Sequence, residues 1–482
     1  MNYSLIFHSG GTCEDTGLSS NSTIHHLPSE VLLEVFDSYR RGIHPHIYDY
    51  KWREQFGWFN LAHVCRKWRA VIFASAYRLD LSIFVGPKKP GHIERILLGP
   101  FLILLDYKRM FEDITLCALW RMHSALEYHD RVREISFGGT SDWFDEFFGA
   151  TNCPFPELES LVLRSGYGEE MEIPDTFLGG PDLSDLRLRR LSLYGVSLAS
   201  TSGVLSSATS LTDLFLRTNS AFSPSTEMSL LACLQNMRCL HSLDLSLLFS
   251  PLESPSHPPT PKDIIPLPKL TRFSYVGPSI FLDALVAGLS APSLRGVNIK
   301  FVDAIWPPIV HLPRFINEIE ERYHTVYVAF LELDLCLSLQ NQSESIGDCD
   351  PCLELGSSMR SESLMRMSCA LSTRLANVEE LHVTFDTTAD EDDIPWRKFY
   401  HQFPSVKMLR TEGAKSIYCI ARTLHQNHEE PDNLTFFPAL EEIDLGKKPF
   451  YNSRRRPQLA AFEPFVSARQ QAGRPVKVFF RP

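Results

Sequence analysis

The clearest pattern in the chain is a spacing of apolar positions: one apolar residue, two variable ones, a second apolar residue, one variable one and a third apolar residue. It first occurs at Val132 and last at Leu440. Neighbouring copies start 23 to 34 residues apart, except for one interval of 84 residues between Leu294 and Val378. The copies begin at Val132, Leu158, Leu188, Leu211, Leu240, Leu270, Leu294, Val378, Val406 and Leu440.

The end of each copy predicts a short strand, because its alternate apolar side chains point to one face. Segments such as 227–237 and 281–290 between copies have helical patterns. Weaker copies at Tyr323 and Leu353 divide the long interval into steps of about 28 residues. The sequence therefore predicts an α/β fold of stacked strand–helix units. An ordinary α/β domain with a parallel sheet is the alternative.

The template and its period are typical of a leucine-rich-repeat solenoid. Asn219 alone occupies the usual asparagine position of such repeats, so we expect an irregular horseshoe over residues 132–482. Segments 250–263 and 340–351 are predicted loops. A helix over 459–471 and a strand in "VKVFF" are predicted to cap the open end.

Variable positions of the predicted strands face the concave side of such a solenoid, where mixed charge can bind a protein target. The candidate target-binding residues are Arg189, Arg190, Arg272, Arg295, Asn298, Glu379, Glu380, His382 and Arg410. Simple exposure to solvent explains the same residue types equally well.

The N-terminal part has a different pattern. Apolar residues at helical spacing follow Pro28 as far as Tyr39, which predicts a helix from Pro28 to about Arg41. A second amphipathic helix is predicted over 61–73. We assign 1–23 to a disordered tail, 24–85 to a small all-α module and 86–131 to linker helices.

The stretches "LPSEVLLEVF" and "LAHVCRKWRAVIF" resemble the two conserved blocks of the F-box, and the whole chain resembles fungal F-box proteins with leucine-rich repeats. The segment that joins the blocks, which includes 41–56, is longer than is usual in that family. The resemblance implies that the module docks on the Skp-type adaptor of a cullin ubiquitin ligase. The implied contact residues are Leu27, Pro28, Glu30, Val31, Leu32, Val35, Phe36, Val64, Cys65 and Trp68. Val64, Cys65 and Trp68 are alternatively part of the module's own core.

Composition narrows the possible functions. The 482 residues carry a net charge of −11, which disfavours general binding to nucleic acid or to an anionic membrane surface. No transmembrane segment or signal peptide is expected. The 11 cysteines are scattered, which fits free thiols in a reducing compartment, cytoplasmic or nuclear.

Signs of catalysis or metal binding are weak. We find no phosphate-binding, dinucleotide-binding, zinc-protease or serine-hydrolase motif. Cys349 and Cys352 have ligand spacing but no second pair nearby. Exposed loops explain three further polar groups: the histidine pairs near residues 25 and 45, the acidic run 386–393 and the arginines 454–456. For the arginines, a nuclear-import signal is the alternative. We expect no catalytic residue, cofactor or metal.

By resemblance, the chain is the substrate-recognition subunit of a Skp–cullin–F-box ubiquitin ligase, not itself an enzyme. Its expected partners are the adaptor and an unknown protein target, without nucleic acid, membrane or a homo-oligomer. A leucine-rich-repeat interaction scaffold with no ligase role is the alternative, and an enzyme with an unrecognised site is a distant third.

Overall fold

The computed structural model describes residues 27–42, 57–87, 97, 99–107, 116–166, 171–180, 186–197, 202–218, 230–247, 264–302, 309–319, 322–330, 335–340, 352–357, 361–385, 396–425, 436–447 and 457–481. The chain divides into two compact units. The first comprises Met1–Phe84 and Pro90–Ile103, and the second Val85–Lys89 and Leu104–Pro482. The predicted tail 1–23, the long connection 43–56, the histidine pairs, the acidic run and the arginines 454–456 lie outside the described residues.

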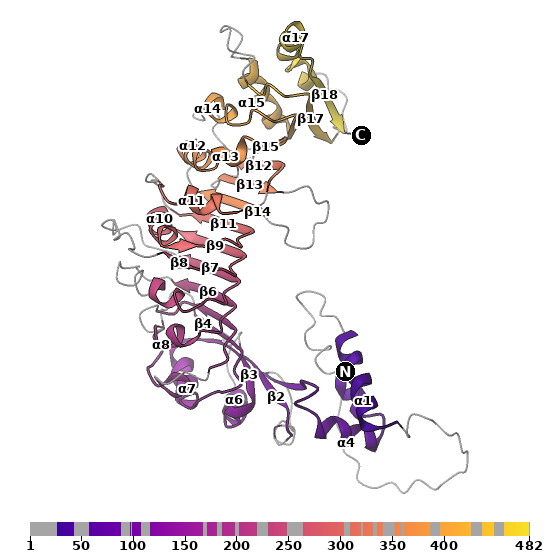
Figure 1. Cartoon of the computed structure of the whole chain (residues 1–482), viewed down its shortest axis with the longest axis vertical. Coiled ribbons are helices and arrows are strands. Elements are labelled where there is room, and N and C mark those ends of the chain that lie inside the picture. The colour runs from indigo at the N-terminus through magenta and orange to yellow at the C-terminus, as the bar shows by residue number, and fades with distance from the viewer. Residues whose placement is uncertain are drawn as a thin grey trace, which may run out of the picture. The chain divides into compact units, whose positions relative to one another are not determined.

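The described helices of the first unit include α1 (Ser29–Gly42), α3 (Gly57–Ala62) and α4 (Arg66–Ala74), of which α1 and α4 are labelled in Figure 1. The predicted helix after Pro28 is confirmed as α1. The prediction of one helix over 61–73 is wrong, because α3 and α4 are separate. Cys65 has extended backbone angles, and its sulfur accepts a hydrogen bond from the backbone N–H of Trp68 at 3.4 Å. Cys65 thus caps α4 and interrupts the helical path.

The core of the first unit is apolar and small. Leu32, Phe36 and Ile72 are buried, and the ring of Phe36 meets the edge of Trp68 at a centroid distance of 4.9 Å. Lys67 Nζ donates to the carbonyl oxygen of Leu27 at 2.7 Å. These contacts hold α1 against α4, so the two blocks of the N-terminal pattern belong to one packed unit.

The region 86–131 is not a purely helical linker as predicted. It contains strand β2 (Leu102–Tyr107) as well as helix α6 (Leu116–Leu126), and β1 (Ser82–Val85) precedes it. The residues of β2 are mostly apolar and buried, which favours a strand with both faces covered.

From β3 onward, the second unit is built on one long sheet (Figure 1). All neighbouring strands in this part pair in parallel except around β13. Their order is β3 (Val132–Gly139), β4 (Ser160–Ser165), β5 (Arg190–Tyr194), β6 (Asp213–Thr218), β7 (Ser242–Leu247), β9 (Arg272–Gly277), β11 (Gly296–Phe301), β14 (Cys352–Ser357), β13 (Leu335–Gln340), β12 (Thr325–Phe330), β15 (Glu380–Phe385), β16 (Met408–Glu412), β17 (Glu442–Lys447) and β18 (Lys477–Arg481). A separate pair is formed by β8 (Ile265–Pro266) and β10 (Leu289–Ser290).

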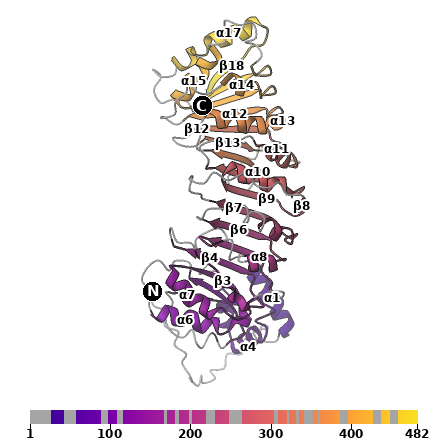
Figure 2. The same cartoon turned by 90° about the vertical axis from the view of Figure 1, so that its left-hand side faces the viewer.

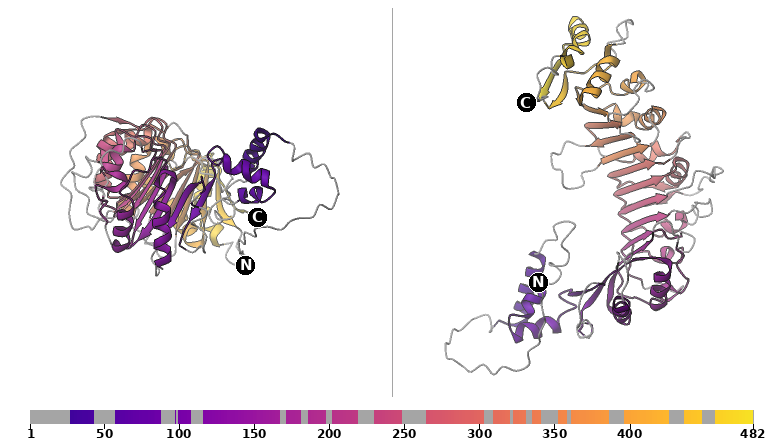
Figure 3. Two further views of the ribbon diagram at one scale, coloured as in Figure 1. Left: turned by 90° about the horizontal axis from the view of Figure 1, so that it is seen from below. Right: turned by 180° about the vertical axis from the view of Figure 1, so that it is seen from behind.

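Helices connect many of these strands and cover one side of the sheet. Figures 1 and 2 show α8, α10, α11 and α12 on the same flank, and Figure 3 shows this flank from behind. The helices of this unit after α6 are α7 (Ser141–Ala150), α8 (Ser202–Ser207), α10 (Ser279–Ala287), α11 (Leu312–Asn317), α12 (Ser361–Ala370), α13 (Ser372–Leu375), α14 (Trp396–Tyr400), α15 (Ala414–His425) and α17 (Glu463–Gln471). None of the helices in the described ranges is long and apolar enough to cross a membrane.

The strand register stacks the apolar template positions on one another. Leu191 pairs with Leu214, and Leu193 with Leu216, and all four are buried. The same rows continue from repeat to repeat, so each unit completes the core of its neighbour. This mixed α/β architecture, with its long sheet of repeated strands, is compatible with a leucine-rich-repeat solenoid.

The strand order reverses inside the long interval of the repeat pattern. Both weaker copies form strands, β12 and β14, as predicted. They are not adjacent, because β13 lies between them and runs antiparallel to both. Consequently β11 pairs with β14, and β12 pairs with β15. The leucines at 335, 337 and 339, which lie in β13, have the two-residue period of a strand.

The C-terminal cap is confirmed as a helix and a strand. Helix α17 is shorter than the predicted 459–471, and β18 pairs in parallel with β17. Arg469 of α17 is buried and donates to the carbonyl oxygen of Leu440 at 3.0 Å. Arg469 thereby ties the cap helix to the residue at which the last repeat begins.

Candidate functional site: the polar face of the sheet

The side chains that alternate with the buried template residues form the polar face of the sheet. Ser192, Phe215, Asp244 and Ser274 lie in one row across β5, β6, β7 and β9. Beyond the inserted strands, Tyr327, His382, Arg410, Asp444 and Phe479 form the corresponding row on β12, β15, β16, β17 and β18. The period-two pattern predicted these positions, and the register shows which side chains become neighbours.

The predicted target-binding residues do not form one site. Arg189, Arg190, Arg272 and Arg295 lie at or just before the first residues of β5, β9 and β11. Glu379, Glu380, His382 and Arg410 lie on or beside β15 and β16. Strands β14, β13 and β12 separate the two groups, and Asn298 pairs with Glu354 on β14 at this boundary.

The second group belongs to a larger cluster, which we call the C-terminal charge network: Glu380, His382, Arg410, Glu412, Asp444 and Arg481. Arg410 lies between two carboxylates, with Nη2 3.4 Å from Oε2 of Glu380 and Nε 3.7 Å from Oδ2 of Asp444. Arg481 Nε is 2.9 Å from the same Oδ2. The network thus links four consecutive strands, β15 to β18, through alternating charges.

Sequence reasoning missed Asp444, Glu412 and Arg481. Arg481 Nη2 bonds Glu412 Oε1 at 2.6 Å, although the two residues are 69 positions apart. Asp444 occupies a variable position of a predicted strand, between Ile443 and Leu445, whereas Glu412 and Arg481 each lie one residue beyond a predicted strand. Strand register, which brings them together, is not encoded in the repeat period.

His382 is held neutral within this network. Burial, followed by the charges of Arg410 and Arg481, lowers the pKa of its imidazole from 6.5 to about 4. Glu380 Oε2 lies 3.7 Å from His382 Nε2, and its negative charge favours the protonated imidazole, which raises the pKa. The loss of hydration and the two guanidinium groups outweigh this effect. The ring also packs against Tyr327 at a centroid distance of 4.3 Å.

Lowering the pH should therefore destabilise the chain through His382. The contribution of His382 to the free energy of unfolding is fully present above pH 6.5 and is lost as the pH falls toward about 4. Between these two pH values the imidazole takes up a proton in the unfolded chain but stays neutral in the folded chain. The expected loss between pH 7 and pH 5 is about 2 kcal/mol. Urea unfolding followed by circular dichroism at both pH values measures it. His382→Gln should show a smaller difference between the two pH values, and an equal difference would contradict the assignment.

A second cluster on the polar face joins an arginine to two aromatic rings. Arg164 of β4 lies over the ring of Tyr194 on β5 at 4.3 Å and donates to its hydroxyl oxygen at 3.3 Å. Tyr194 stacks on Phe215 of β6 at 4.4 Å. The cluster places partly exposed aromatic surface beside Arg217, which pairs with Tyr194 in the strand register, and a cation beside aromatic rings is common in protein-binding surfaces.

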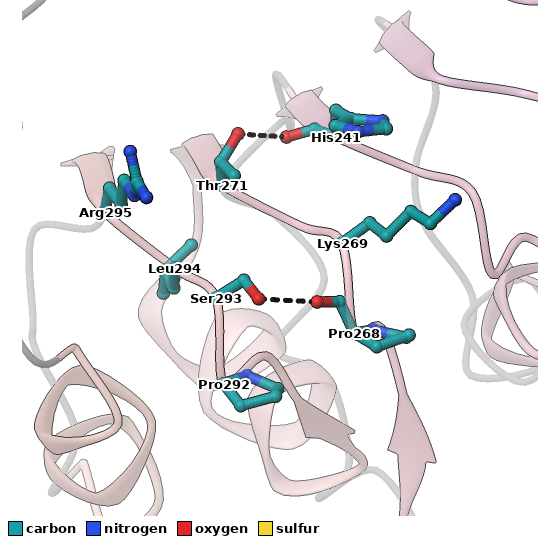
Figure 4. A pocket seen from close by; sticks show the side chains of 8 residues that line it. All are labelled: His241, Pro268, Lys269, Thr271, Pro292, Ser293, Leu294 and Arg295. Carbon is teal, nitrogen blue, oxygen red and sulfur yellow. Dashed lines mark hydrogen bonds between the residues drawn. The ribbon is translucent and has the colours of Figure 1, made fainter.

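A hollow of about 490 Å³ lies where the chain enters β7, β9 and β11 (Figure 4). It is lined by His241, Pro268, Lys269, Thr271, Pro292, Ser293, Leu294 and Arg295. Thr271 Oγ1 donates to the carbonyl oxygen of His241 at 3.1 Å, and Ser293 Oγ donates to that of Pro268 at 2.6 Å. These bonds fix the entering segments next to each other, and no carboxylate lines the hollow.

The predicted adaptor-binding residues divide into exposed and buried sets. Val31, Val35 and Val64 are exposed, as are Pro28 and Glu30, whereas Leu27, Cys65 and Trp68 are partly covered. Leu32 and Phe36 are 0% and 2% exposed, so their placement on a docking surface is corrected. Their burial follows from the helical period, which turns them toward α4.

The described residues contain no group of side chains suited to hold a metal ion. Cys349 lies outside the described residues, and of Cys352 the structure describes the backbone in β14 alone.

No protein-family model and no curated protein matches the sequence. Among solved structures, the chain aligns with a chain of "Crystal structure of TLR13-ssRNA13 complex" at 11% identity and a TM-score of 0.28. The alignment covers 83% of this chain and 48% of the other, so this chain spans about half the length of that neighbour.

Proposed function

We propose that the chain recognises a protein target for a Skp–cullin–F-box ubiquitin ligase. The first unit docks the Skp-type adaptor, and the polar face of the repeat sheet holds the target. The chain carries out no chemical step itself. It holds the target near a ubiquitin-charged enzyme, which raises the effective concentration of the target's lysines.

The observation that carries this proposal is the apolar surface of the first unit. Val31, Val35 and Val64 are 43%, 45% and 55% exposed, within the two blocks that resemble the F-box. A unit with so small a core gains stability when such residues are covered by a partner. Pro28 and Glu30 are exposed on the same helix α1 or at its start, where they supply contacts that are not purely apolar.

Co-purification with a Skp-type adaptor tests the proposal. We expect the wild-type chain to retain the adaptor and Val31→Asp/Val35→Asp to bind at least about tenfold more weakly, because two buried carboxylates would replace apolar contacts. Leu116→Asp, at an exposed apolar residue of α6 in the second unit, is the matched control and should bind like wild type. A wild-type chain that does not retain the adaptor would refute the ligase role.

An interaction scaffold without a ligase role is the second candidate. It is favoured by the charged and aromatic clusters of the polar face, whose geometry arises entirely within the second unit. Target binding with no adaptor binding is the result that would select this function.

A further inference from the structure

Positive charge accumulates where the chain enters strands β5 to β11. We call this surface the basic edge and define it by seven residues: Arg187, Arg189, Arg190, Arg238, Lys269, Arg272 and Arg295. Within the described segments that lead into these strands, 186–190, 209–213, 238–242, 267–272 and 292–296, Asp213 is the single carboxylate. The whole chain has a net charge of −11, so this edge differs in sign from the average surface.

Most of these cations lack a carboxylate partner among the described residues. Arg187 pairs with Glu157 at 3.2 Å, and Arg272 with Asp213 at 3.7 Å. The remaining five are exposed and form no ion pair with another described residue. The corresponding lysines of the C-terminal repeats behave differently, since Lys407 and Lys477 each bind a glutamate at 3.1 Å.

The hollow between the entering segments gives this edge a defined recess. Lys269 and Arg295 rise from its two sides, and His241 stands at a third position (Figure 4). The hydroxyl hydrogens of Thr271 and Ser293 are committed to backbone carbonyl oxygens. An anionic group in the hollow would therefore be bound by Lys269 and Arg295 rather than by the hydroxyl groups.

We propose that the basic edge binds an acidic peptide segment of the target, with one carboxylate seated in the hollow. This inference rests on the proposed function, because it names the chemistry of the target that the second unit holds. Strands lie about 4.8 Å apart, so β5 to β11 spans roughly 19 Å, the length of about six extended residues. Charge beyond about 8 Å is screened at physiological salt, so the local cations dominate over the net negative charge.

Fluorescence anisotropy on the full chain tests the inference. The probe is a labelled peptide with six consecutive glutamates, and its matched control has six glutamines. The glutamate peptide should bind at least about tenfold more tightly at low salt, and the difference should shrink at high salt. Lys269→Glu/Arg295→Glu should reduce its affinity by at least about tenfold. Arg322→Glu/Lys398→Glu, at exposed cations of the C-terminal half, should not.

Three results would overturn the inference: equal binding of the two peptides, an unchanged affinity in Lys269→Glu/Arg295→Glu, or tighter binding of a single-stranded oligonucleotide that the same variant abolishes. If circular dichroism shows that this variant unfolds, Lys269→Gln/Arg295→Gln replaces it with the same expected direction. Adaptor co-purification is measured on the same variants. If the chain retains the adaptor but does not prefer the glutamate peptide, only the inference about the basic edge is refuted. If the wild-type chain does not retain the adaptor, the ligase role is refuted.

Discussion

Replacement of Asp444 by alanine is expected to open the C-terminal end of the sheet. Its side chain is 2% exposed and lies between Arg410 and Arg481, and Oδ1 accepts the backbone N–H of Gly446 at 2.9 Å. Without this carboxylate, two guanidinium groups face each other across β17, and the Gly446 N–H, at a backbone φ of 78°, loses its acceptor. Removal of one partner from a buried charged network costs about 3 kcal/mol or more.

The loss should remain local, because a stacked repeat is stabilised mainly by its nearest neighbours. Hydrogen exchange measures it: the free energy of opening of β17 and β18 should fall by about 3 kcal/mol, while β5 to β7 stay as in wild type. Glu412→Gln is the control, since Glu412 is largely exposed and its pairing with Arg481 contributes less than about 1 kcal/mol. Equal protection of β17 in wild type and Asp444→Ala would mean that the network does not stabilise the cap.

Replacement of Phe36 by alanine is expected to unfold the first unit and leave the second folded. Phe36 is 2% exposed, and its ring packs edge-on against Trp68. Truncation of a buried phenylalanine costs about 3–5 kcal/mol, which is comparable to the whole stability of a small module. Hydrogen exchange should show lost protection in Ser29–Gly42 and unchanged protection in the repeat strands.

Val35→Ala provides the matched control, because Val35 is next to Phe36 in the same helix but 45% exposed. Its effect on folding should be below about 1 kcal/mol, while adaptor binding should weaken. Phe36→Ala should abolish adaptor binding as a consequence of unfolding. Retention of a protected α1 in Phe36→Ala would show that the core of the unit lies elsewhere.

The sequence by itself determined the local structure of the repeats. The apolar template located the repeat strands from β3 to β17 with the exception of β13, and the helical spacing after Pro28 located α1. These predictions held because they depend on side chains within a few residues of one another. They also identified the variable strand positions, which include Glu380, His382, Arg410 and Asp444 of the C-terminal charge network.

The tertiary structure alone decided how these pieces combine. The reversed order β11-β14-β13-β12-β15 depends on pairing between distant segments, and an average period of 28 residues fits either order. The separation of α3 from α4 depends on Cys65, whose sulfur caps a helix in a run of otherwise helical spacing. Glu412 and Arg481 meet because β16 and β18 flank β17, whose pairing with β18 shifts register between Asp444 and Lys447. Periodicity fixes which face a side chain occupies, whereas its neighbours on that face are fixed by strand order and register.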